Sequence, residues 1–327
     1  MGKLYDSALL HNNDWIIPKG NELTEQKISI VIPVYHPRYL KEVLKHLSKI
    51  GGIYEVIVVF DGMDDDPYQV IDDYDYNFTV VKHDRNRNAP GANNTGSVYA
   101  SGDIILFLDQ DMILSPSYIL NAKKLLSANS NMGVVLGFRD NVDYDNVPSL
   151  DNWKEANYLN DWRMRTSIDE SFLDLTVSSC GAVNNNCNKD EILEIYKTSN
   201  EFRNLGIDKE RTIGFWDLPC MVISHTLAIT REHFMTIGGY PEWIVGWGGE
   251  DIALGFLATA YHLPIIPNVV GSYHIKHAPH SGSEKQKWLE MRRNLEKYKK
   301  WANSINEFSR IDEEQIYTRS KIIYKSR

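Results

Sequence analysis

Apolar runs and helical patterns alternate over the first third of the chain. Four apolar runs, rich in Ile and Val, cover residues 28–35, 54–60, 78–81 and 103–108. The first run is followed by residues at helical spacing, namely Tyr39, Leu40, Val43, Leu44 and Leu47. Strands that are apolar on both faces and alternate with helices are typical of a parallel sheet covered by helices. The sequence therefore predicts an α/β fold with a mostly parallel central sheet, whose ligands bind at the carboxyl ends of the strands.

The pattern changes further along the chain. Residues 140–218 are rich in Asn, Asp and Trp with weak periodicity, which predicts a loop-rich insertion with some helices. Regular signals return with a predicted strand over 221–229, a short helix over 231–237 and a longer helix over 250–261. Apolar residues at helical spacing then predict a helical tail over 284–327, and they include Trp288, Met291, Leu295, Tyr298 and Trp301.

Composition and charge narrow the function. The 327 residues are 43% hydrophobic, as in globular proteins, and carry a net charge of -9. This charge argues against a general nucleic-acid binder, which needs a basic surface. An anionic ligand would therefore need a metal ion or a local cationic patch. The tail carries 12 Lys and Arg against 7 Asp and Glu, a net of +5, and residues 1–283 carry 23 against 37, a net of -14.

The cysteines and the hydropathy of the chain indicate where in the cell the protein is expected. Cys180, Cys187 and Cys220 match neither a zinc site nor a disulfide framework. The first 27 residues lack a basic stretch followed by an apolar run, and no run of about 18 apolar residues occurs. We therefore expect a cytoplasmic protein. The basic tail is compatible with peripheral contact at the inner face of the cell membrane, and a packed amphipathic helix is the favoured alternative.

A first candidate for chemistry is Asp109-Gln110-Asp111, at the end of an apolar run. Two carboxylates on either side of one residue can share a divalent cation with a phosphate. On its own this pattern is more often a solvated acidic turn, so its context must decide.

A second candidate is the segment 246–251, Gly-Trp-Gly-Gly-Glu-Asp. Glycines allow close approach of the backbone to a ligand, Trp247 offers a flat face to a sugar ring, and Glu250 and Asp251 offer a base. Without context, a flexible turn followed by a helix start explains the segment better.

A third candidate is the pair His274 and His277. A neutral imidazole is a good ligand for manganese, which is the favoured ion over magnesium, and a histidine that follows two aspartates suits a metal bound to a diphosphate. His280 is a weaker candidate in the loop 278–286. A lone histidine is more often a packing or surface residue.

The ordered series Pro33-Val34-Tyr35, Asp61-Gly62, Asn93-Asn94 and Asp109-Gln110-Asp111 resembles the family-two glycosyltransferases, which have the glycosyltransferase-A fold. The resemblance covers roughly residues 28–280. It implies that Pro33, Tyr35 and Asp61 hold the nucleoside base and that Asp109 and Asp111 hold a metal ion on the diphosphate. The family has Arg-Asn where this chain has Asn93-Asn94, which puts the donor contact of Asn94 in question; Arg85 or Arg87 would compensate.

The segment 246–251 is similar to the acceptor motif of the β-1,4-galactosyltransferases and bacterial chondroitin polymerases. This likeness implies that Asp251 removes the acceptor proton and that Glu250, with Trp247 and Gly249, holds the acceptor. His225 lies at a position that resembles the acceptor-side strand. For the metal, the galactosyltransferases imply His274 together with His277, whereas the polymerases imply His274.

The resemblance implies four segments: a lead segment 1–27, a nucleotide-sugar-binding half 28–139, an acceptor-binding and catalytic half 140–283, and a basic helical tail 284–327. The expected reaction is inverting transfer of a sugar from a UDP-sugar, with galactose or N-acetylgalactosamine favoured, to a hydroxyl of a saccharide or lipid-linked saccharide, in the synthesis of a surface polysaccharide or glycoconjugate. The alternatives are a retaining polypeptide-type glycosyltransferase and a non-catalytic carbohydrate-binding protein on the same fold.

Overall fold

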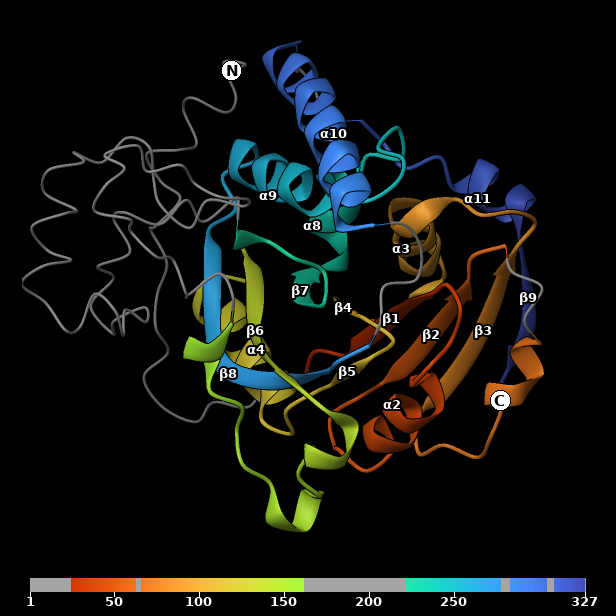
Figure 1. The fold of residues 1–327 in the computed structure, drawn as a ribbon, viewed down its shortest axis with the longest axis vertical. Coiled ribbons are helices and arrows are strands. Elements are labelled where there is room, and N and C mark those ends of the chain that lie inside the picture. Colours follow the sequence, from red (N-terminus) through yellow and green to blue (C-terminus); the bar gives the residue numbers. More distant parts are fainter. Residues whose placement is uncertain (1–24, 63–65, 162–220, 278–282, 305–308, 327) are drawn as a thin grey trace, which may run out of the picture.

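The computed structural model describes residues 25–62, 66–161, 221–277, 283–304 and 309–326 (Figure 1). The expectations for the three cysteines, for His280, for residues 1–24 and for most of 140–218 therefore lie outside the described residues.

One sheet of nine strands organises the described residues, in the order β5-β8-β6-β7-β4-β1-β2-β3-β9. The strands are β1 (Ile28–Val34), β2 (Glu55–Phe60), β3 (Asn77–His83), β4 (Ile104–Leu108), β5 (Met112–Ile113), β6 (Val134–Val142), β7 (Thr226–Thr230), β8 (Ile265–Ile275) and β9 (Ser320–Lys325). The helices are α2 (Leu40–Leu47), α3 (Asn88–Tyr99), α4 (Tyr118–Ala128), α8 (Arg231–Thr236), α9 (Glu250–Ala260), α10 (Glu284–Ser304) and α11 (Glu313–Arg319). Short 3-10 turns cover Pro67–Val70, Tyr144–Asn146, Leu150–Asn152 and Tyr158–Asn160.

The predicted parallel arrangement is confirmed for the first four strands. β1 pairs in parallel with both β2 and β4, and β2 pairs in parallel with β3. β6 and β8 form a further parallel pair, whereas β5, β7 and β9 run antiparallel to their neighbours. The expected boundary at residues 139 and 140 falls inside β6, so the two halves share one sheet.

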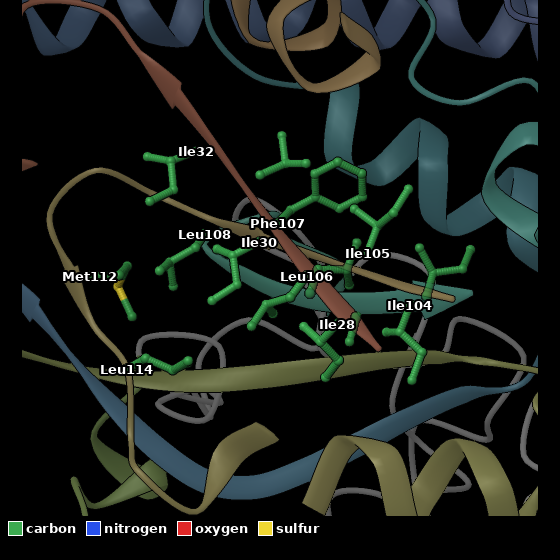
Figure 2. Packing of buried hydrophobic residues seen from close by; sticks show 14 of the residues in the cluster. Ile28, Ile30, Ile32, Ile104, Ile105, Leu106, Phe107, Leu108, Met112 and Leu114 are labelled. Atoms are coloured by element: carbon green, nitrogen blue, oxygen red, sulfur yellow. The ribbon is translucent and has the colours of Figure 1, made fainter. Parts of the chain in front are cut away.

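Helices cover both faces of the sheet, as Figure 1 shows, with α2 and α4 on one side and α3, α8 and α9 on the other. The apolar strands β1 and β4 form the centre of the core, and Figure 2 shows the side chains of Ile28, Ile30 and Ile32 and those from Ile104 to Leu108. α3 packs so closely on β1 that a side chain at Gly96 would not fit, since a Cβ there would lie 2.3 Å from Val31 Cγ1.

The tail packs against the body of the protein. The predicted helices are confirmed as α10 and α11, and the chain then adds β9, an edge strand antiparallel to β3 that was not predicted. Arg319, at the end of α11, donates two hydrogen bonds to the Glu242 carboxylate at 2.5 and 2.6 Å. Among the described residues no helix has the length and apolar character needed to span a bilayer. Peripheral docking of the tail on an anionic membrane stays a prediction.

Candidate active site

The carboxyl ends of β1, β2 and β4 meet at one edge of the sheet because the three strands are parallel. Half-buried Pro33 lies near the end of β1 and exposed Tyr35 follows that strand, buried Asp61 follows β2, and Asp109 and Asp111 follow β4. The Gln110 side chain donates a hydrogen bond to the Tyr35 carbonyl at 3.0 Å, which ties the loop after β4 to the loop after β1. The structure therefore brings the candidates of the first half together.

Asp61 is held from two directions. Its Oδ1 accepts hydrogen bonds at 2.7 Å from His83 Nδ1 and from the backbone amide of Arg87. The other ring nitrogen of His83 lies 2.8 Å from the Thr95 hydroxyl on α3. Since Nδ1 donates to the carboxylate, Nε2 of a neutral His83 accepts from Thr95. The chain Thr95, His83, Asp61 is buried and fixes the orientation of the carboxylate.

Three residues that could bind a metal ion, Asp111, His274 and His277, lie close together where β5 pairs with β8. β5 pairs with β8 so that Met112 lies opposite His274, and this register places Asp111 beside the end of β8. Asp111 Oδ2 is 2.8 Å from His277 Nε2, and its Oδ1 is 3.4 Å from His274 Nε2. Ligand atoms of the three residues all lie within 4.8 Å of one another.

The donor set fits a divalent transition metal such as Mn²⁺. It combines one carboxylate with two imidazoles, a mixture that suits such ions. Asp111 Oδ1 is buried and has no hydrogen-bond partner among the described residues, so it has a lone pair to offer. Burial and the positive charge of Arg139 lower the pKa of His274 to about 4, which keeps its imidazole in the neutral form that binds a metal.

Asp109 differs from Asp111 in its electrostatics. Burial and the neighbouring Asp111 carboxylate raise the pKa of Asp109 to about 7. For Asp111, burial acts in the same direction but is outweighed by the hydrogen bond from His277 and the charges of the two histidines, so its pKa lies below the usual value. Asp109 is not part of the group of ligand atoms found among the described residues, and its role in metal binding stays a prediction.

Asp251 is connected to Asp109 through two successive residues before β7. The backbone amide of Ser224 donates to Asp251 Oδ1 at 3.1 Å, and the carbonyl of His225 accepts from the amide of Asp109 at 3.2 Å. Burial and the neighbouring Glu250 carboxylate raise the pKa of Asp251 well above its ordinary value. Burial raises the pKa of Glu250 as well. A buried carboxylate with a raised pKa is suited to accept a proton near neutral pH.

The glycine segment before Asp251 forms a loop that is exposed at residues 245–247, buried at Gly249 and ends at the start of α9. Gly249 is the N-cap of α9, and the Trp247 side chain is 46% exposed. The Lys287 amine lies 5.6 Å from the centre of the Trp247 ring. The loop thus carries an exposed aromatic side chain three residues before Glu250, and the role of Trp247 as a sugar platform stays a prediction.

Two predicted contact residues have structural partners. Asn94 Nδ2 donates to the Tyr240 carbonyl and to Glu242, and its Oδ1 accepts from the Tyr240 amide at 2.8 Å. His225 is fully buried, with Nδ1 2.7 Å from the Thr226 hydroxyl. Asn94 therefore anchors the loop that follows Gly239, and the donor contact of Asn94 and acceptor contact of His225 stay predictions. Of the two arginines that could compensate, Arg87 pairs with Asp84 at 2.9 Å and Arg85 is exposed.

Three contributors were missed by reasoning from the sequence. Arg139 on β6 lowers the pKa values of Asp109 and His274, although it belongs to no motif. His83 could have been suspected only from its position at the end of a strand. Tyr240 is buried beside Asp251, where burial and that carboxylate raise its pKa, and the sequence marks it only by the preceding Gly238-Gly239.

Comparison with known families gives two matches. The sequence model of glycosyl transferase family 2 matches residues 29–206, and a model described as the N-terminal domain of galactosyltransferase matches residues 222–277. The first includes Asp61, Asp109 and Asp111, and the second includes Asp251, His274 and His277.

Individual relatives are distant. A validoxylamine A glucosyltransferase from Streptomyces hygroscopicus subsp. limoneus is 24% identical over 250 residues, which are 73% of this chain and 49% of that protein. An uncharacterized glycosyltransferase from Haemophilus influenzae is 26% identical over 33% of this chain and 37% of its own length. The chain thus spans about half the length of the curated glucosyltransferase that it matches.

Among solved structures, one of GalNAc-T7 with UDP, GalNAc and Mn²⁺ aligns with a TM-score of 0.52 and 13% identity, over 86% of this chain and 50% of that one. This likeness confirms the predicted fold class, an α/β sheet flanked by helices.

Proposed function

The chain belongs to glycosyl transferase family 2, and we propose that it transfers a sugar from a UDP-sugar to a hydroxyl of a saccharide acceptor with inversion at the anomeric carbon. The observation that carries this proposal is the connection of Asp251 to Asp109, which lies two residues before Asp111 of the candidate metal group. The link is the pair of residues Ser224 and His225, whose backbone contacts Asp251 on one side and Asp109 on the other.

The donor would lie along the carboxyl edge of β1, β2 and β4. His83 and the Arg87 amide both donate to Asp61 Oδ1 and so fix the orientation of the carboxylate. In this orientation Asp61 would accept a hydrogen bond from an N–H of the nucleoside base. Pro33 and Tyr35 would cover the base on its open side. Arg139, in strand β6, which β7 separates from β4, adds a positive charge close to Asp109 and the expected diphosphate.

Asp111, His274 and His277 would hold the metal ion, Mn²⁺ in the first place and Mg²⁺ as the alternative, with Asp109 nearby. When bound, such an ion supplies positive charge that favours departure of the diphosphate. The acidic body of the protein, with its net charge of -14 over residues 1–283, is consistent with a site that recruits a cation before it binds an anionic donor.

Asp251 would act as the general base. The acceptor hydroxyl gives its proton to the Asp251 carboxylate while its oxygen forms a bond to the anomeric carbon. The bond from that carbon to the diphosphate oxygen breaks, and the electron pair leaves with the diphosphate. Because attack and departure take place on opposite faces, one displacement inverts the anomeric centre. Trp247, Gly249 and Glu250 would hold the acceptor ring in place.

The test is a screen of UDP-sugars with Mn²⁺. UDP-galactose, UDP-N-acetylgalactosamine and UDP-glucose are each incubated with the protein, and UDP release and thermal stabilisation are measured. The anomeric configuration of the product is read by proton NMR. Transfer with inversion supports the proposal.

Two other outcomes identify the alternatives. A product that retains the donor configuration indicates a retaining polypeptide-type enzyme. Stabilisation by saccharides without release of UDP from any donor indicates a non-catalytic carbohydrate-binding protein, and either result contradicts the proposed reaction.

His83 offers a prediction for the donor side. His83→Leu removes the donor to Asp61 Oδ1, and hydrogen bonds to a charged group contribute about 1.5–3 kcal/mol. We expect the Kd of UDP, measured by calorimetry with Mn²⁺ present, to rise about tenfold or more. Thr95→Ser keeps the hydroxyl that contacts His83 and serves as the control. Equal UDP affinity of His83→Leu and wild type would show that the His83 contact does not orient Asp61 for the base.

A further inference from the structure

The glycine loop 245–249 has a backbone that most residues cannot adopt. Gly246, Gly248 and Gly249 have φ angles of 86°, 81° and 100°, in the left-handed region that favours glycine. This loop leads directly into Glu250 and Asp251 at the start of α9. Whatever holds the loop therefore also determines where Trp247 and Asp251 lie.

The contacts that hold the loop come from α10. Asn294, fully buried in the middle of that helix, directs its side-chain amide at three loop carbonyls. Its Nδ2 is 2.8 Å from the carbonyl oxygen of Gly248, 3.3 Å from that of Val245 and 3.4 Å from that of Trp247. An amide nitrogen has two hydrogens, so the three carbonyls share them. Asn294 Oδ1 has no partner among the described residues, which leaves the donor half of the amide to make the contact.

Neighbouring residues of α10 hold the same loop. Glu290, one turn earlier, accepts from the amide of Trp247 at 3.0 Å, and the Arg293 guanidinium donates to the Val245 carbonyl at 3.1 Å. Both of these side chains reach the rim of the loop, whereas Asn294 alone of the three is buried.

The loop and α10 are also complementary in shape. A Cβ at Gly248 would lie 3.1 Å from Met291 Cγ, and a Cβ at Gly249 would lie 3.2 Å from Asn294 Cβ. Glycine is thus needed at these positions for two reasons: it allows the loop to lie close to α10, and it allows the positive φ angles. Since Gly249 is the N-cap of α9, the position of Asn294 is transmitted over two residues to Asp251.

We propose that Asn294 is a positioning residue, which holds the loop 245–249 so that Trp247 receives the acceptor and Asp251 meets its hydroxyl. The inference rests on the proposed function and adds α10 to the acceptor site. An aspartate of the same size at position 294 would turn a carboxylate oxygen toward the three carbonyls, and repulsion would release the loop.

The test compares Asn294→Asp with Tyr298→Leu. Tyr298 lies one turn further along α10 and packs against Phe256 and Trp301, in a cluster with Ile244 and Ala253, so its variant reports loss of the apolar packing between α10 and α9. The acceptor probes are 4-nitrophenyl glycosides of glucose, galactose and N-acetylglucosamine, with the UDP-sugar that the wild type uses. Hydrogen exchange of the backbone over 245–251 and the Kd of UDP are measured in parallel.

For Asn294→Asp we expect kcat/KM for the acceptor to fall about 100-fold, as for a misplaced catalytic group, with the Kd of UDP unchanged and exchange over 245–251 faster. Tyr298→Leu should keep acceptor kcat/KM within a factor of about three. Equal losses in the two variants, or unchanged exchange and transfer in Asn294→Asp, would overturn the proposal. If Asn294→Asp does not fold, Asn294→Ala is judged by the same criteria.

A failure of the proposed function is distinguishable from a failure of this inference. If the wild type releases UDP from no donor, the proposed reaction is wrong. The exchange of the loop in the Asn294 and Tyr298 variants then still decides whether Asn294 holds it.

Discussion

Replacing Asp251 with asparagine is expected to lower kcat for sugar transfer by about 10²–10⁴-fold, the usual contribution of general-base catalysis. The substitution keeps the shape of the side chain and its contact with the Ser224 amide, but the amide cannot take the acceptor proton. The Kd of UDP should not change, because Asp251 lies beside the donor site and not within it. Initial rates of UDP release and calorimetry with UDP and Mn²⁺ measure the two quantities.

Glu232→Gln is the matched control, since it neutralises an exposed carboxylate on the nearby helix α8. It should retain wild-type turnover. Turnover of Asp251→Asn within a factor of about three of the wild type would show that another group acts as the base.

The raised pKa of Asp251 gives this variant a second signature. In the wild type, kcat should fall as the pH decreases through that raised pKa, because the base becomes protonated, and Asp251→Asn should lack this dependence. For stability the sign is reversed. A carboxyl group with a higher pKa in the folded state favours folding at low pH, and this contribution is lost as the pH rises from the unfolded value through the folded one. At neutral pH the Tm of Asp251→Asn should therefore equal or exceed that of the wild type.

Replacing Asp111 with alanine is expected to weaken Mn²⁺ binding by more than about 100-fold, since even partners outside the first coordination shell contribute 10–100-fold. The carboxylate is the only anionic member of the group with His274 and His277 among the described residues. UDP affinity of the variant should fall to the value that the wild type shows with a chelator. Calorimetric titrations with Mn²⁺ and then with UDP measure both effects.

Asp103→Asn provides the control for Asp111, because Asp103 is exposed just before the opposite end of β4. Unchanged UDP affinity in Asp111→Ala, or in the wild type with chelator, would exclude the proposed metal site. Separate alanine variants of His274 and His277 then tell whether one or both histidines bind the ion.

The strands β1, β2 and β4 were predictable because their apolar runs are continuous and end in turn or acidic residues. Their predicted parallel arrangement places Asp61, Asp109 and Asp111 at one edge of the sheet. The predicted strand over 221–229 is confirmed only as Thr226–Thr230. The strand begins later than predicted because the Ser224 amide donates its hydrogen bond to Asp251 and not to a neighbouring strand.

The role of α10 was not predictable. Its helical spacing is evident, but Glu290, Arg293 and Asn294 resemble a solvated face in sequence, and only the fold shows that they contact the glycine loop. Arg139 was missed for a similar reason: it is a single residue in a strand, and its effect depends on the pairing of β6 with β8.

The strand β9 has a consequence for the synthesis of this protein. It pairs with β3, and the contact between the Phe78 amide and the Ser326 hydroxyl joins residues 248 positions apart. At about 5–20 residues per second, about 12 to 50 s pass on the ribosome between the appearance of the two partners. During that time the outer edge of β3 has unpaired backbone groups, and such edges are prone to pair with other chains. The nascent protein therefore exposes an aggregation-prone edge for most of its translation.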